Sequence, residues 1–104
     1  YLNTVALLRT RLAPTVLLDF LHAIEARHGR TRAAGAPRWQ SRTLDLDLIV
    51  YGDLQTESDS LTVPHPRAAE RDFVLAPWLD IDPDAVIPGR GPVRDLLATM
   101  GGER

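Results

Sequence analysis

The sequence lacks cysteine and lysine altogether, and each absence bears on the sites that the chain can form. A chain without cysteine forms no disulfides and has no thiolate metal ligands. A chain without lysine carries its positive charge on arginine, here twelve residues. A base-composition bias of the source genome would explain arginine in place of lysine at all positions of the chain. A demand for planar, bidentate phosphate contacts would explain it only at a binding site.

Long apolar runs and a strong charge imbalance are also missing. No run approaches the ~18 apolar residues of a membrane span, and no secretory leader pattern is visible. The formal net charge is −2, so bulk electrostatics favours neither nucleic acid nor a membrane surface, and an anion site would have to be local. We therefore expect a cytoplasmic protein with no nucleic-acid or membrane partner.

What remains is the composition of an ordinary globular domain. The chain has 104 residues, of which 44% are hydrophobic and 25% charged. This length suits a single small core, so we expect residues 1–104 to belong to one domain. Because Tyr1 stands directly in a strand-like pattern, we also expect residues to precede it in the natural protein.

Hydrophobic periodicity predicts both strand and helix in the N-terminal half. The stretch from Tyr1 to Arg11 carries apolar groups on both faces, which is typical of an interior strand. Pro14 suits the first turn of a helix. Apolar residues then recur at helical spacing as far as His28, where Gly29 would provide the C′ position.

The C-terminal half predicts shorter pieces. Residues Arg67–Leu79 are helix-like but are expected to break or kink near Pro77. Residues Ile81–Gly91 are rich in turns, and Pro92–Met100 predicts a short helix that ends at Gly101. Two clear strands are too few for an independent sheet, so a two-layer α+β sandwich lacking its first strands fits best.

The most informative stretch is a second predicted strand, Thr43–Tyr51. Asp45 and Asp47 share one face of it, and the other face is apolar throughout, with Leu44, Leu46, Leu48 and Val50. Residues two apart on a strand lie roughly 6.5–7 Å apart, so the carboxylates could hold one shared cation or two neighbouring ones. A solvated polar face of an edge strand is the alternative, although aspartate is disfavoured in strands.

A basic loop precedes this strand. Residues 30–42 contain four arginines and no acid, and they also contain Trp39. The loop could simply be solvated, but a polyphosphate would relieve the repulsion among its guanidinium groups. Hard cations such as Mg²⁺ take carboxylate oxygens and complete their shell with water and phosphate, so the loop and the strand together have the parts of a Mg-nucleotide site. Trp39 is either a core plug or a stacking platform for a flat ring.

His65 stands between two prolines, in the rigid stretch Thr62–Pro66. Taken alone it reads as a structural histidine, although a fixed imidazole also suits a phosphate or ribose contact. Arg71 and Phe73, taken alone, read as helix surface and core. The glycine-rich phosphate-binding loops of the common nucleotide folds are absent from the sequence.

In this order and spacing, these residues resemble the 6-hydroxymethyl-7,8-dihydropterin pyrophosphokinases of folate biosynthesis. The resemblance covers essentially the whole chain and rests on Tyr1-Leu2-Asn3, Glu25 with Gly29-Arg30, Arg38-Trp39 with Arg42-Thr43-Leu44-Asp45-Leu46-Asp47, Leu61-Thr62-Val63-Pro64-His65-Pro66 and Arg71-Asp72-Phe73-Val74-Leu75. It implies an ATP-dependent diphosphotransferase that transfers diphosphate from MgATP to the hydroxymethyl oxygen of the dihydropterin and releases AMP. It also implies a ferredoxin-like α+β sandwich with an antiparallel sheet, whose N-terminal strands lie outside these residues.

The resemblance also implies residue roles. Asp45 and Asp47 would bind two Mg²⁺ ions that bridge the ATP phosphates. The remaining roles are catalytic for Arg30 and Arg42, pterin-binding or site-closing for Tyr1, Asn3, Trp39 and Phe73, and ATP-binding for Glu25, Arg32, Thr62, His65 and Arg71. Two extra residues within Thr31–Arg38 leave the role of Arg38 open.

The resemblance further predicts a monomer, with fusion to other folate-pathway enzymes as an open alternative, and little activity for these residues alone. Two rival functions stay open. One is a non-catalytic nucleotide or RNA-binding module, which usually displays aromatic residues on exposed strands; only Tyr1 and Tyr51 are available here. The other is a structural or regulatory remnant without activity.

Overall fold

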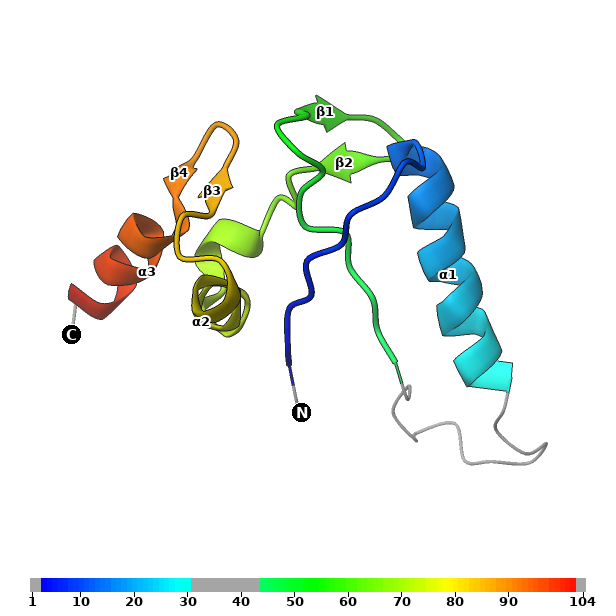
Figure 1. The fold of residues 1–104 in the computed structure, drawn as a ribbon, viewed down its shortest axis with the longest axis horizontal. Helices are drawn as coiled ribbons and strands as arrows, with labels where there is room; N and C mark the ends of the chain where they lie inside the picture. Colours follow the sequence, from blue (N-terminus) through cyan, green and yellow to red (C-terminus); the bar gives the residue numbers. More distant parts are fainter. Residues whose placement is uncertain (1–2, 31–43, 103–104) are drawn as a thin grey trace.

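The computed structural model describes residues 3–30 and 44–102, and within these ranges the chain is a small α+β structure. Its elements are three α-helices, a 3-10 turn and two antiparallel strand pairs (Figure 1). The strand pairs are separate, two strands each, where the sequence predicts one larger sheet.

The first helix, α1 (Pro14–Arg30), begins where its proline predicts. The amide of Leu17 donates to the carbonyl of Ala13 at 2.9 Å, which places Pro14 at the first helical position. The predicted C′ role of Gly29 is wrong, because the helix continues through it. Glycine accepts helical backbone angles at a cost of about 1 kcal/mol relative to alanine, so a glycine ends a helix only where the chain also turns away.

Two extended segments run through the middle of the molecule between α1 and α2 (Figure 1). They are residues 3–11 and 44–51, both predicted as strands, and neither is part of a strand pair in the described residues. The strand predictions were therefore wrong in this structure. Alternating polarity reports which side chains are buried, but a strand also requires a neighbouring backbone to hydrogen-bond with.

The two strand pairs are short hairpins. β1 (Thr56–Glu57) pairs with β2 (Thr62–Val63), and β3 (Val86–Ile87) pairs with β4 (Gly91–Pro92). Gly89 turns the second hairpin with a φ of 80°, in the left-handed region that glycine enters readily.

The Arg67–Leu79 stretch is interrupted at Arg71, and the break predicted near Pro77 is wrong, because the helix continues through this proline. A 3-10 turn, η1 (Ala68–Glu70), is followed by extended backbone at Arg71 and then by α2 (Asp72–Ile81), which contains Pro77. The last helix, α3 (Val93–Gly102), agrees with the predicted terminal helix but continues beyond its expected end.

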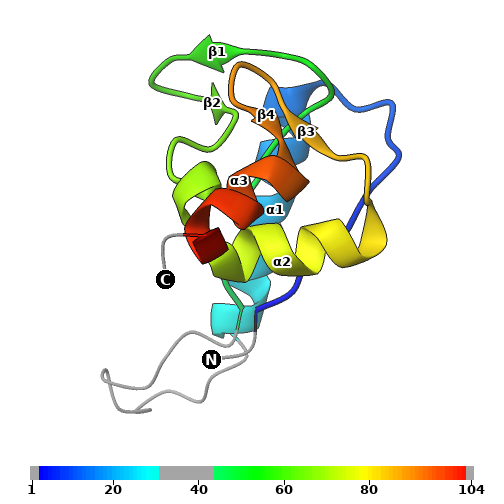
Figure 2. The same ribbon diagram turned by 90° about the vertical axis from the view of Figure 1, so that its left-hand side faces the viewer.

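The core lies between α2, α3 and the β3–β4 hairpin (Figure 2). Its buried members are Ala69, Leu75, Trp78, Ala85, Ile87 and Val93. Val5, Ile49 and Val50 pack against it from the two extended segments, so this core holds the segments to the C-terminal half. Within the described residues, none of the helices has the length and apolar character needed to cross a membrane.

Truncation of a fully buried core residue tests this packing. Leu75 is 0% exposed, so Leu75→Ala should lower the free energy of unfolding by roughly 2–5 kcal/mol. Val86 is 52% exposed, and Val86→Ala is the matched control that should change it by less than about 0.5 kcal/mol. Denaturant unfolding followed by circular dichroism measures both, and equal losses would contradict the core assignment.

Candidate functional site

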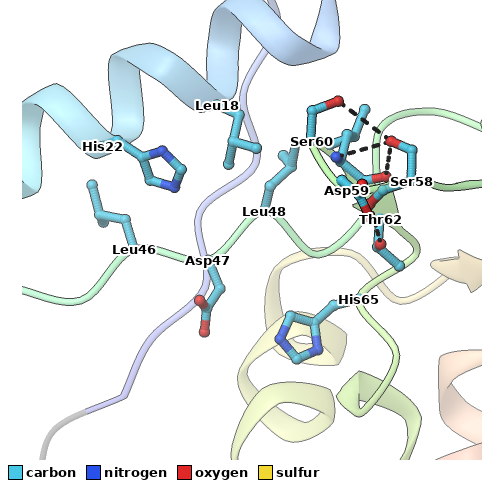
Figure 3. A pocket seen from close by; sticks show the side chains of 11 residues that line it. Leu18, His22, Leu46, Asp47, Leu48, Ser58, Asp59, Ser60, Thr62 and His65 are labelled. Atoms are coloured by element: carbon cyan, nitrogen blue, oxygen red, sulfur yellow. Dashed lines mark hydrogen bonds between the residues drawn. The ribbon is translucent and has the colours of Figure 1, made fainter.

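The two aspartates lie on an extended segment whose leucines face α1. Leu46 and Leu48 are half-buried and point toward α1, whereas Asp47 points to the other side of the segment (Figure 3). Asp45 and Asp47 are both exposed. The alternation predicted for this segment is therefore confirmed through Leu48, and it places both carboxylates where a cation and its ligands can reach them.

Hydrogen bonds to other parts of the chain hold this segment. The amide of Leu46 donates to Oε2 of Glu25 in α1 at 2.7 Å, and the carbonyl of Ile49 accepts from the amide of His65 at 2.7 Å. At the end of the segment the hydroxyl of Tyr51 donates to the carbonyl of Leu12. Together these hydrogen bonds fix the backbone of the segment at Leu46 and Ile49 and the side chain of Tyr51 at its end.

His65 is fixed in both backbone and ring. The hydrogen bond from its backbone amide to the Ile49 carbonyl places it beside the aspartate segment. Pro64 and Pro66 restrict the backbone on either side. The amide of Arg67 donates to Nδ1 of the imidazole at 3.2 Å. Because Nδ1 then acts as acceptor, the neutral ring carries its proton on Nε2, which makes Nε2 a hydrogen-bond donor.

The turn between β1 and β2 approaches the same place. Ser58 closes this turn: its hydroxyl donates to the carbonyl of Leu61 at 3.0 Å and accepts from the Leu61 amide at 3.1 Å. The Ser58 amide also donates to the Leu61 carbonyl, at 2.9 Å. These local bonds hold Thr62, the next residue, at the edge of the site.

A cavity of about 220 Å³ opens between α1, the aspartate segment and the β1–β2 turn (Figure 3). Three residues predicted for the nucleotide end, Asp47, Thr62 and His65, line it together. An apolar wall is formed by Leu18, Leu46, Leu48 and Leu61. Pockets for whole drug-sized ligands are roughly 300–1,000 Å³, so this cavity has the size for one part of a nucleotide.

His22 is a cavity residue that the sequence analysis did not identify. It projects from α1, one turn after Leu18, and both residues line the cavity (Figure 3). The available signal was its helical spacing, four residues after Leu18 and three before Glu25. An isolated histidine in such a place has many explanations, so sequence alone does not select it.

Arg71 and Phe73 form a separate pair. The guanidinium carbon of Arg71 lies 5.6 Å from the ring centroid of Phe73, within cation–π range. Phe73 is 46% exposed, so the core role that it suggests when taken alone is wrong. Neither residue lines the cavity, and Asn3 is exposed on its extended segment.

The remaining predicted residues lie at the end of α1 or outside the described residues. Arg30 is the last residue of α1. The others lie outside the described residues: Tyr1, Arg32, Arg38, Trp39 and Arg42.

The donor set can be tested against a divalent cation. In the described part of the chain, no three His, Cys, Asp or Glu side chains converge as a ready-made metal site. Two exposed carboxylates on one segment nevertheless fit Mg²⁺, which is commonly bound through one or two carboxylates with water and substrate phosphates as the other ligands. They do not fit a transition metal held by histidine or thiolate.

Comparison with known families agrees with the motifs. The profile of the 7,8-dihydro-6-hydroxymethylpterin-pyrophosphokinase family matches residues 1–83. That range contains both aspartates, the cavity and the Arg71–Phe73 pair.

Curated relatives cover most of this chain. A 2-amino-4-hydroxy-6-hydroxymethyldihydropteridine pyrophosphokinase from Synechocystis is 50% identical over 88% of the chain and 45% of its own length. The enzyme of that name from Haemophilus influenzae is 40% identical over 93% of the chain and 59% of its own length. A folate synthesis bifunctional protein from Pisum sativum is 39% identical over 99% of the chain and 22% of its own length. The chain thus spans about half the length of its bacterial relatives.

Proposed function

Because the chain belongs to the 7,8-dihydro-6-hydroxymethylpterin-pyrophosphokinase family, we propose that the natural protein transfers diphosphate from ATP to 6-hydroxymethyl-7,8-dihydropterin. The observation that carries the proposal is the cavity in which Asp47, Thr62 and His65 meet. Asp47 comes from a segment separate in sequence from the stretch that carries Thr62 and His65, and the family resemblance implies a role at the nucleotide for all three.

The proposed reaction is a diphosphoryl transfer. The hydroxymethyl oxygen attacks the β-phosphorus of ATP, the bond from that phosphorus to the α,β-bridging oxygen breaks, and AMP leaves. The hydroxyl proton passes to solvent or to a phosphate oxygen. Such transfers depend on alignment and on neutralising charge more than on covalent help from the protein.

The apolar wall of the cavity suits the base of the nucleotide. Leu18, Leu48 and Leu61 offer faces on which a flat ring can pack. Thr62 and His65 then lie at the side on which sugar and phosphate would extend, and Nε2 of His65 supplies a donor for an anionic oxygen. In this arrangement the base would lie against α1 and the phosphates toward Asp47.

Asp45 and Asp47 would hold the metal, which we propose to be two Mg²⁺ ions. Magnesium at this position would neutralise phosphate charge and favour the in-line arrangement of the reacting groups. The exposure of both carboxylates supports this role, because the phosphates of the substrate must complete the metal shell.

The arginines of residues 30–42 would act on the phosphates. Arg30 and Arg42 would stabilise the charge of the transferring group, and Arg32 would assist in binding ATP. Trp39 would close over the site together with these residues, which would exclude water during transfer.

The pterin end would use Asn3, Phe73 and Tyr1. Asn3 provides an amide for the polar edge of the heterocycle, and the exposed ring of Phe73 offers a face for stacking. Arg71 lies over that ring in this structure and is proposed to contact ATP. Phe73 can take the pterin on the face that the guanidinium does not cover.

We further propose that residues 1–104 are part of one pyrophosphokinase domain, whose complete form is a ferredoxin-like sandwich, and that the protein acts as a monomer. The bifunctional pea relative supports fusion to another folate enzyme as an alternative arrangement.

The direct test is an assay of AMP formation by the full natural protein. We expect AMP from ATP and Mg²⁺ only when 6-hydroxymethyl-7,8-dihydropterin is present, with one AMP for each diphosphorylated pterin. ATP hydrolysis that ignores the pterin, or no AMP at all, would contradict the proposed function.

Removing one metal-binding carboxylate should abolish most of the activity. Asp47→Asn keeps the size of the side chain but removes its charge. Turnover should fall by roughly a hundredfold or more, because the magnesium that neutralises the phosphates would lose a carboxylate ligand. Asp53→Asn, in the exposed turn after Tyr51, is the matched control and should leave turnover unchanged. Steady-state kinetics at saturating Mg²⁺ measures both, and normal turnover in Asp47→Asn would refute the metal role.

Arg42→Ala separates transition-state stabilisation from binding. If Arg42 acts on the transferring group, kcat should fall by roughly a thousandfold, while the Kd for ATP changes by less than about fivefold. Arg94→Ala, on the exposed surface of α3, should behave as wild type. A large rise in Kd with a normal kcat would instead make Arg42 a binding residue.

A further inference from the structure

We propose that Glu25 is a positioning residue for the two aspartates and acts through the backbone of Leu46. This inference rests on the proposed function, since it concerns how the metal-binding segment is held. The Glu25 carboxylate accepts a hydrogen bond from the Leu46 amide at 2.7 Å, and that amide lies between Asp45 and Asp47 in the chain. Glu25 thus links α1 to the centre of the site without contacting ATP.

The bond has the geometry of a strong contact. It is part-buried and spans 21 positions of sequence, and an ionised acceptor makes such a bond shorter and stronger than one between neutral groups. Because Glu25 stands on a regular helix, its Cα is fixed by α1. The amide of Leu46 is therefore held relative to a rigid element.

The bond bears on the rotation of the segment at the point that matters for the site. Within residues 3–30 and 44–102, the extended backbone at 44–51 is outside both hairpins, and its Leu46 amide is held by Glu25. Adjacent side chains of an extended segment point to opposite faces. A rotation about the segment axis would consequently move both carboxylates away from the phosphates and pull Leu46 out of the cavity wall.

A direct contact between Glu25 and the nucleotide fits the structure less well. Glu25 is not among the residues that line the cavity, although Leu18 and His22 of the same helix are. Its Oε2 atom already accepts from Leu46. A further carboxylate facing a triphosphate would also repel it.

The test compares two conservative variants in the full natural protein. Glu25→Gln keeps an oxygen acceptor at the same reach and loses the charge, whereas Glu25→Asp keeps the charge and shortens the reach by one methylene. We expect Glu25→Gln to stay within about threefold of wild type in turnover and in the Mg²⁺ concentration for half-maximal activity. We expect Glu25→Asp and Glu25→Ala to lose at least about tenfold in both.

One further measurement separates positioning from a direct role. Hydrogen exchange of the Leu46 amide should accelerate in Glu25→Asp and stay slow in Glu25→Gln. Asp19→Ala, exposed on the same helix, is the matched control and should match wild type throughout.

Each outcome decides the inference. Equal impairment of Glu25→Gln and Glu25→Asp, or wild-type behaviour of Glu25→Asp, would overturn the inference, and lost turnover in Glu25→Asp with a still slow exchange of the Leu46 amide would make Glu25 a direct ligand instead. If Glu25→Ala does not fold, the Gln and Asp variants still decide. A wild-type protein that makes no pterin-dependent AMP would overturn the proposed function, whereas the exchange rate of the Leu46 amide tests the hydrogen bond independently of activity.

Discussion

The site depends on how an extended segment is held in place by hydrogen bonds from three other parts of the chain. Residues 44–51 carry the two aspartates, and hydrogen bonds anchor the segment at Leu46, at Ile49 and at Tyr51. Each anchor comes from a different part of the chain: α1, the stretch after β2, and the end of the first extended segment. Ile49 and Val50 also pack against the C-terminal core. The position of the aspartates therefore depends on contacts from several parts of the fold.

This arrangement divides the segment into two functional faces. Leucines directed at α1 build the apolar wall of the cavity, and the aspartates on the other face remain exposed for metal and phosphate. Apolar burial thus determines the direction of the charges, because turning a carboxylate toward α1 would require removing it from water. The same alternation explains how one short segment can serve both the base and the phosphates of a nucleotide.

The sequence predicted the local chemistry of this site better than its backbone pairing. Alternating leucine and aspartate predicted the two faces correctly, and Pro14 predicted the start of α1 correctly. Residues 44–51 were predicted to be a strand but are not paired within the described part of the chain, since pairing depends on a partner that the periodicity of a segment does not specify. Gly29 was misassigned for a related reason: its backbone tolerance permits a helix end but does not require one.

Long-range contacts were beyond sequence patterns altogether. The hydrogen bond from Leu46 to Glu25 joins residues 21 positions apart, and the place of His22 in the cavity depends on how α1 packs against the aspartate segment. Phe73 appeared apolar enough for the core, yet the break at Arg71 turns it outward to meet a guanidinium. The family motifs identified several of these residues, but not the contacts through which they act.

The most direct test of this account is the metal dependence of ATP binding to the full natural protein, measured by isothermal titration calorimetry. If Asp45 and Asp47 hold magnesium against the phosphates, ATP should bind at least about tenfold more tightly with Mg²⁺ than in EDTA. The same affinity in both conditions would contradict the account, because the two aspartates would then hold no magnesium against the phosphates.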